Sequence, residues 1–217
     1  DSVLTNFALS FDGEDDYVQL NQDAISGNIV SITTWFNVLE QQNPSDEDSG
    51  SPIYCQGADS GSWATFCIGF RSNEIWLEMG SEDQSLLTNE FSFGIWYHLG
   101  IVFDNGFVTT YINGSEVSNV VMESTIVTNN GSGAFIGRRW ALMGNDDIEY
   151  SYEGNIDKIG VWDSNLAEQQ IQDIYNYGIN GNENNLSGYW NFNSGSGDTL
   201  YDYSGNQNHG TIYGATW

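Results

Sequence analysis

Positively charged residues are scarce in this chain. Four Lys and Arg residues stand against 30 Asp and Glu residues, which gives a formal net charge of −26 at pH 7. So negative a protein repels nucleic acids and anionic membrane surfaces, and neither is expected as a partner. Neutral glycans, cationic partners and divalent metal ions remain compatible with this charge. The alternative explanation is solubility in a salty medium, where self-repulsion is screened.

Proline and long apolar runs are scarce as well. With 2 Pro and 25 Gly, the chain suits many short strands joined by tight turns. No stretch approaches the roughly 18 apolar residues of a membrane-spanning helix, so membrane insertion is not expected. The chain begins at Asp1 without Met, as a mature product or an excised domain would.

Cysteine occurs only twice, at Cys55 and Cys67. Both residues lie in strand-like segments that would form the two arms of a hairpin. The spacing is not C-x-x-C and no His cluster accompanies it, which argues against zinc or redox chemistry. We expect a disulfide, worth roughly 3 kcal/mol by the loop-entropy argument, and hence an oxidising compartment. Two reduced thiols in the core are the alternative.

Alternating apolar and polar residues predict strands through most of the chain. The segment 30–38 alternates with a period of two, as a strand with one buried face does. Asn-Gly pairs at 105–106 and 113–114 flank the run 107–112 and predict two tight hairpin turns. The length favours one all-β domain spanning residues 1–217 over two smaller domains.

One segment has the pattern of a helix. Asn165 is a suitable N-cap with Glu168 three residues later, the spacing of a capping box. An apolar stripe that includes Ile171 follows, and Gly178 is suited to the C-terminal end. The pattern predicts one short helix near residues 166–177.

Oxygen-bearing side chains alternate in the tail, a spacing that calcium loops use. The predicted ligands are Asp202, Ser204, Asn206, Asn208 and His209, the last two through the nearby backbone. The set lacks a closing Glu, so other loops would complete it, with Asp12, Asp15 and Asp157 as the candidates. The alternative is an Asx-turn, in which Asp202 and Asn206 hydrogen-bond the local backbone. No reacting group stands nearby, so the calcium would be structural.

Several segments occur in the same order as in a known family. They are Ala8–Gly13 with Asp16–Val18, Ile32–Trp35, Trp96–His98 through Tyr111–Gly114, Gly154–Asp157 through Val161–Trp162, and the tail from Leu186. Together they resemble laminin-G-like modules, which are concanavalin A-like (lectin and glucanase) jelly rolls. The resemblance implies an all-β fold, a two-sheet antiparallel jelly-roll sandwich with one short helix. It also implies a module that commonly contains calcium and binds glycans or proteins outside the cell.

Two acidic insertions, 41–50 and 145–153, interrupt the strands and provide candidate ligand-binding residues. These aromatic and acidic rim residues are Tyr54, Trp63, Trp140, Tyr150, Tyr152, Asp46, Asp48, Asp146 and Asp147. Sugar rings present C–H faces to aromatic planes and hydroxyls to carboxylates, so the combination suits a glycan. The alternative is a core position, since most aromatic residues of a sandwich are buried. Five strand tryptophans are expected in the core, namely Trp35, Trp76, Trp96, Trp162 and Trp190.

Half of the cations stand together as Arg138 and Arg139. They would clamp an anionic sugar or, as we favour, form ion pairs with neighbouring carboxylates. His98 lies within a predicted strand and is expected to be structural.

Catalysis is not expected, and no catalytic residues are assigned. The best enzymatic candidate is Glu74-Ile-Trp-Leu-Glu78, which resembles the strand motif of laminarinase-like glycoside hydrolases of this fold. Trp76 replaces the Asp that the family places between its two catalytic carboxylates. In a straight strand the two Cα atoms would be roughly 13 Å apart, whereas a retaining glycosidase needs carboxyl groups about 5–5.5 Å apart.

The sequence therefore predicts an extracellular recognition or adhesion module that binds a glycan or a protein. The alternative is a structural subunit of an extracellular fibre, appendage or viral surface, which would self-assemble or contact neighbouring modules. A terminal strand that pairs with another copy would support that alternative. A glycoside hydrolase is the third hypothesis.

Overall fold

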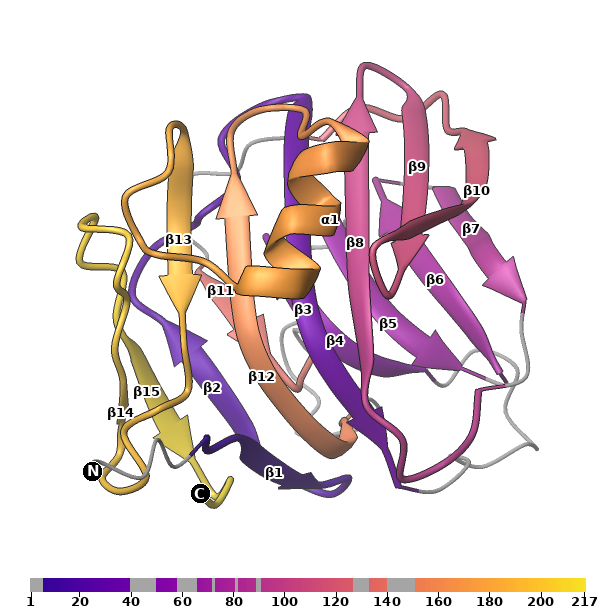
Figure 1. Ribbon diagram of the computed structural model, residues 1–217. Coiled ribbons are helices and arrows are strands. Elements are labelled where there is room, and N and C mark those ends of the chain that lie inside the picture. The colour runs from indigo at the N-terminus through magenta and orange to yellow at the C-terminus, as the bar shows by residue number, and fades with distance from the viewer. Residues whose placement is uncertain are drawn as a thin grey trace.

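The computed structural model describes residues 6–39, 50–57, 66–71, 73–80, 82–88, 91–126, 133–139 and 151–217. Two sheets pack face to face, and a helix lies on the outer side of one of them (Figure 1). This is the antiparallel sandwich that the sequence predicts.

The first sheet carries the helix. Its spatial order is β1 (Leu9–Asp12), β12 (Glu153–Trp162), β3 (Ile29–Val38), β8 (Tyr97–Asp104), β9 (Phe107–Ile112) and β10 (Ser115–Val121). Strand β13 (Leu186–Trp190) also pairs with β12. All of these pairings are antiparallel.

The second sheet contains the C-terminal strands. Its spatial order is β14 (Thr199–Leu200), β15 (Gly210–Tyr213), β2 (Tyr17–Leu20), β11 (Ala134–Ile136), β4 (Ser51–Gln56), β5 (Phe66–Arg71), β6 (Glu74–Met79) and β7 (Glu82–Thr88). These pairings are antiparallel too. The last strand, β15, pairs with β2 of its own chain, and the backbone of Thr216 pairs with Ser10 in β1. The C-terminal segment therefore pairs with strands of both sheets of its own chain.

Strand alternation builds the core between the sheets. In β3, the side chains of Val30, Ile32, Phe36 and Val38 join the main apolar cluster, as the period of two predicts. Residues of the other parity, such as Ser31 and Trp35, lie on the outer side, where the helix and the segment before it cover part of the strand. Both faces of β3 are therefore largely buried.

The two Asn-Gly turns form as predicted. Asn105 and Gly106 have φ of 47° and 95°, and Asn113 and Gly114 have φ of 50° and 80°. These left-handed values are the ones that a tight hairpin turn requires. They join β8 to β9 and β9 to β10.

The helix α1 spans Glu168–Tyr177 and ends at Gly178, whose φ is 81°. Its N-cap is Ala167, and the backbone N–H of Ala167 donates to Gln170 Oε1 at 2.9 Å. The predicted cap at Asn165 is wrong, because that side chain donates to Asp104 instead. Ile171 packs onto the outer face of β8 at Gly100, where a Cβ would come within 3.1 Å of it.

The predicted disulfide is confirmed. Cys55 in β4 and Cys67 in β5 are directly opposite each other, with their Cα atoms 4.1 Å apart. Together with Trp76 they form a small apolar cluster separate from the main core. The bond therefore ties two adjacent strands on the outer face of the second sheet.

Four of the five expected core tryptophans lie in strands. Trp76, Trp162 and Trp190 are fully buried, and Trp35 is partly buried beneath the helix. The core prediction is wrong for Trp96, which is 39% exposed. Strand β8 begins one residue later, at Tyr97, so Trp96 is outside the alternation that would turn it inward.

Among the residues that the structure describes, no helix has the length and hydropathy of a membrane span.

Replacing both Cys55 and Cys67 by Ala is expected to lower the free energy of unfolding by about 3 kcal/mol, because the unfolded chain regains its loop entropy. Urea titration of the oxidised protein measures the change. Reduced wild-type protein is the control and should match the double variant. An unchanged midpoint after reduction would refute the contribution.

His98 makes stability depend on pH. Its side chain is buried, and desolvation lowers its pKa from 6.5 to about 4. The unfolded chain therefore binds the proton first, so the stability is complete above pH 6.5 and is lost as the pH falls towards 4. We expect a loss of up to about 3 kcal/mol from this residue. Urea unfolding across this range should show a shallower pH dependence in His98→Gln than in wild type, and equal slopes would contradict the assignment.

Candidate functional site

The tail loop between β14 and β15 is closed by one carboxylate. Asp202 Oδ1 accepts hydrogen bonds from the backbone N–H groups of Tyr189 and Ser204, at 3.0 and 2.8 Å. Asp202 Oδ2 accepts from the Ser204 hydroxyl and the Asn208 N–H, both at 2.9 Å. This is the hydrogen-bonded turn that the sequence left open as the alternative to a metal loop.

The other predicted ligands of the tail are also engaged in hydrogen bonds. Asn206 Nδ2 donates to the carbonyl oxygens of Leu186 and Ser187. Asn208 exchanges two hydrogen bonds with the backbone of Gln22, and His209 Nδ1 accepts from Asp202 N–H at 3.0 Å. The loop therefore fastens the tail to β13 and to the segment after β2.

The structure does not group the three remote candidates, Asp12, Asp15 and Asp157, with Asp202. Asp157 lies in β12 and its Oδ2 binds Lys158, while Asp12 is the last residue of β1. Among the described residues, one group of three or more acidic, His or Cys side chains has its ligand atoms within 4.8 Å of one another. That group is Asp12, Asp15 and Asp16, and it does not include Asp202.

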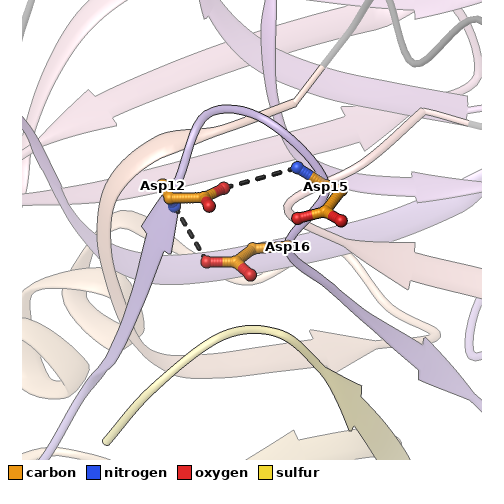
Figure 2. A group of neighbouring side chains, drawn as sticks. All are labelled: Asp12, Asp15 and Asp16. Carbon is orange, nitrogen blue, oxygen red and sulfur yellow. Dashed lines mark hydrogen bonds between the residues drawn. The ribbon is translucent and has the colours of Figure 1, made fainter.

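We call Asp12, Asp15 and Asp16 the acidic turn, which joins β1 to β2 (Figure 2). Asp12 Oδ1 accepts from the N–H groups of Glu14 and Asp15, at 2.8 and 3.4 Å, and Asp16 Oδ2 accepts from Asp12 N–H at 2.9 Å. These bonds fold the chain so that three carboxylates meet. Their other oxygens accept no hydrogen bond from the described residues.

The surroundings of Asp16 make its ionised, negatively charged form unfavourable. Burial raises the pKa of Asp16 above its usual range, and repulsion from Asp12 and Asp15 adds to the effect. The hydrogen bond from Asp12 N–H opposes the rise. A divalent cation would relieve this repulsion, and carboxylate oxygens are ligands that Ca²⁺ prefers. The acidic turn thus fits the metal that the resemblance implies.

A row of stacked side chains lies directly beside the acidic turn, on the outer face of the second sheet. Tyr17 in β2 stacks on Tyr213 in β15, with ring centroids 4.6 Å apart and planes inclined by 16°. The guanidinium carbon of Arg138 lies 4.8 Å from the Tyr17 ring centroid, a cation–π contact. We call these three residues the tyrosine stack.

Tyr213 is the terminal residue of the tyrosine stack and is exposed to solvent. Strand β14 pairs only with Gly210 and Thr211, so it does not extend alongside Tyr213. The Tyr213 side chain is 43% exposed as a result. Its neighbour Gly214 packs so closely on the acidic turn that a Cβ would come within 2.0 Å of Asp16 Oδ1.

The predicted rim residues divide into two groups. Tyr54 and Tyr152 are wrong as rim residues, because both are fully buried and donate inward, to Gln56 Oε1 and the Asn37 carbonyl. The remaining predictions lie outside the described residues, namely Asp46, Asp48, Trp63, Trp140, Asp146, Asp147 and Tyr150.

Arginines contact the two carboxylates of the enzymatic candidate. Arg71 binds Glu74 at 2.7 Å and also binds Asp83, while Arg139 binds the buried Glu78 at 2.7 Å. The ion-pair prediction is therefore met for Arg139, whereas Arg138 contacts the Tyr17 ring. Each glutamate of the motif thus has a cation as a direct partner.

Asp16, Tyr17 and Tyr213 were not among the residues predicted for the site. The doublet Asp15-Asp16, three and four residues after Asp12, is a signal for the acidic turn, because a tight turn brings such neighbours together. No sequence signal places Tyr213 beside Tyr17, since they are 196 positions apart and meet through the β2–β15 register.

The comparisons with known proteins agree with this architecture. The sequence model of a laminin G family, described as the concanavalin A-like lectin/glucanases superfamily, matches residues 12–172. The chain therefore belongs to the concanavalin A-like lectin/glucanase superfamily. No curated protein matches the chain in sequence.

Solved structures that share the fold include the following three. A Bacteroides ovatus protein, described provisionally as carbohydrate binding, has a TM-score of 0.74 and 14% identity over 98% of this chain and 60% of its own. The chain thus spans about three fifths of that protein. A heptameric SAP-like pentraxin from Limulus polyphemus has a TM-score of 0.66 and 17% identity over 98% and 96%. Domain 4 of an extracellular arabinanase from Geobacillus stearothermophilus, in complex with arabinotriose, has a TM-score of 0.58 and 18% identity over 77% and 76%.

Proposed function

We propose that this chain is an extracellular recognition and adhesion module that binds carbohydrate on the outer face of the second sheet, with a structural calcium ion in the acidic turn. The observation that carries the proposal is the contact between two features. Asp16 directly precedes Tyr17, and Gly214, which directly follows Tyr213, lies against the Asp16 carboxylate. The acidic turn and the tyrosine stack therefore form one continuous surface.

The tyrosine stack suits the apolar face of a sugar ring. Tyr17 contacts Arg138 and stacks on the Tyr213 ring, which is thereby held in place while Tyr213 stays 43% exposed. A preorganised aromatic surface of this kind loses little entropy on binding. The neighbouring carboxylates accept hydrogen bonds from sugar hydroxyls.

Asp12, Asp15 and Asp16 would hold the calcium ion through their carboxylate oxygens. The bound ion would neutralise the repulsion among these side chains and fix the turn that leads into Tyr17. Asp12 and Asp16 already hold the backbone of the turn in place through their hydrogen bonds.

Connectivity keeps the remaining rim residues as ligand candidates. Residues 140–150 join Arg139 to Ser151, and Ser151 forms a bridge with Arg138 of the tyrosine stack. Trp140, Asp146, Asp147 and Tyr150 thus belong to a segment that starts and ends beside this surface. Trp63 belongs to the connection between the disulfide-linked strands β4 and β5.

Other observations support the assignment of the module. The disulfide favours an oxidising, extracellular setting. Two proteins of similar fold are linked to sugars, one described provisionally as carbohydrate binding and one solved in complex with arabinotriose.

Self-assembly into a fibre, an appendage or a viral surface remains the alternative, although the terminal strand pairs within its own chain. Hydrolysis remains the third hypothesis.

Replacing Tyr213 by Ala is expected to weaken binding to neutral polysaccharides about tenfold, because the exposed ring of the stack is lost. Affinity gel electrophoresis against a panel of neutral polysaccharides measures the effect. Tyr201→Ala is the matched control, since Tyr201 is 47% exposed and lies outside the surface. Equal retardation of both variants and wild type would remove the tyrosine stack from the site. Release of reducing sugar that disappears in Glu74→Gln would favour hydrolysis instead.

Millimolar calcium is expected to raise the melting temperature of the wild-type protein, since binding to the folded state alone stabilises it. The rise should be lost in Asp15→Asn and Asp16→Asn and retained in Asp198→Asn, an exposed aspartate outside the turn. Differential scanning calorimetry with and without chelator gives the increment for each variant. If the calcium-induced rise in melting temperature is retained in Asp16→Asn but lost in Asp202→Asn, the calcium ion binds in the tail loop and not in the acidic turn.

A further inference from the structure

A pocket of about 520 Å³ lies between α1 and the outer face of the first sheet. This volume is within the range of about 300–1,000 Å³ that is usual for small-molecule sites. Its lining includes Trp35, Trp96, Tyr175 and Tyr177, together with Asp157 and Lys158. It is on the opposite face of the sandwich from the tyrosine stack, so it is a separate site.

Aromatic rings give the pocket a rigid wall. Trp35 in β3 stacks on Tyr175 in α1, with centroids 5.6 Å apart and planes inclined by 24°. Both rings contact His98 beneath them, at 5.3 and 5.7 Å. Trp96 and Tyr177 are 39% and 85% exposed, so they present open aromatic surface at the mouth. Aromatic residues this exposed do not contribute to the core.

A backbone irregularity places polar groups in the same pocket. The register between β12 and β3 shifts between Asp157 and Gly160, which is a bulge, and Lys158 within it has a φ of 51°. A left-handed conformation is unfavourable for a lysine, and such strain clusters at functional sites. The bulge turns Lys158 towards Asn6, whose side-chain oxygen accepts from Lys158 Nζ at 3.1 Å.

Asp157 retains an unused hydrogen-bond acceptor. The Asp157 side chain is only 6% exposed, its Oδ2 binds Lys158 Nζ, and its Oδ1 has no hydrogen-bond partner among the described residues. Burial raises the pKa of this carboxyl, and the contact with Lys158 opposes the rise. A buried acceptor without a partner is unfavourable, and a hydrogen-bond donor supplied by a ligand would offset that penalty.

The charges of the pocket indicate a neutral ligand. Lys158 already neutralises Asp157, so a ligand cation would meet an ammonium group at the same place. An anion would be opposed by the net charge of −26. A sugar ring satisfies the remaining requirements, because it has an apolar C–H face for the aromatic rings and hydroxyl groups for Asp157 and Lys158.

We propose that this pocket is a second ligand site of the chain and that it binds one neutral sugar ring. The ring stacks on Trp96 and Tyr177 at the mouth, and its hydroxyls hydrogen-bond with Lys158 and Asp157. This site goes beyond the surface proposed above and is independent of calcium.

Titration with methyl glycosides of glucose, galactose and arabinose, followed by tryptophan fluorescence and by saturation-transfer NMR, tests the proposal. We expect one of these glycosides to bind in the presence of chelator. Trp96→Ala and Asp157→Asn should each weaken this binding at least about tenfold. Phe107→Ala is the matched control, because Phe107 is 59% exposed on β9 of the same sheet and lies outside the pocket.

The comparison with Tyr213→Ala separates this proposal from the proposed function. Loss of glycoside binding in Trp96→Ala with retention in Tyr213→Ala supports the pocket, whatever happens at the tyrosine stack. Loss only in Tyr213→Ala overturns the pocket and leaves the proposed function standing. Binding of tetramethylammonium in place of every glycoside, or no binding of any of these probes, also overturns the pocket.

Discussion

The requirement that every strand bury one face against the opposite sheet controls where this protein can present ligand sites. Both inner faces are filled by one apolar cluster, so functional side chains are left to the outer faces and the strand ends. The two candidate surfaces follow this division. The tyrosine stack lies on the outer face of the second sheet, and the aromatic pocket lies on the outer face of the first.

The Asp202 carboxylate links the fold to the first of these surfaces. Its hydrogen bond from Tyr189 N–H joins the tail loop to β13, and its three bonds from Ser204 and Asn208 hold the loop itself. The indole of Trp190, also in β13, donates to the Asn208 carbonyl at 2.8 Å. The tail can then supply β15, which places Tyr213 against Tyr17 and Gly214 against Asp16. A residue that the sequence suggested as a metal ligand thus acts by positioning a strand.

Local signals predicted the fold well. Alternation, the Asn-Gly turns and the glycine that ends the helix depend on neighbours in sequence, and all of them are confirmed. Tyr54 was misplaced because β4 is buried on both faces, so alternation could not distinguish the rim from the core. Trp96 was misplaced by one residue at the start of β8, a boundary that local pattern does not define.

The sites were less predictable because they are built from residues far apart in sequence. Tyr17 meets Tyr213 through a strand register, and Trp35 meets Tyr175 through the packing of a helix on a sheet. The bulge at Lys158 has no distinctive sequence, since a lysine on an outer face looks the same in a regular strand. Only the acidic turn is local, and the Asp15-Asp16 doublet after Asp12 points to it.

The pairing of Ser10 with Thr216 has a mechanical consequence. The two segments run antiparallel and exchange two backbone hydrogen bonds, of 2.8 and 3.0 Å, close to where the chain enters and leaves the sandwich (Figure 1). A pulling force applied through both ends would break these hydrogen bonds one after the other. It would not load a long row of inter-strand hydrogen bonds simultaneously. Tension on the two ends would therefore reach the Ser10–Thr216 bonds before it reaches the pairing of β15 with β2 that holds Tyr213.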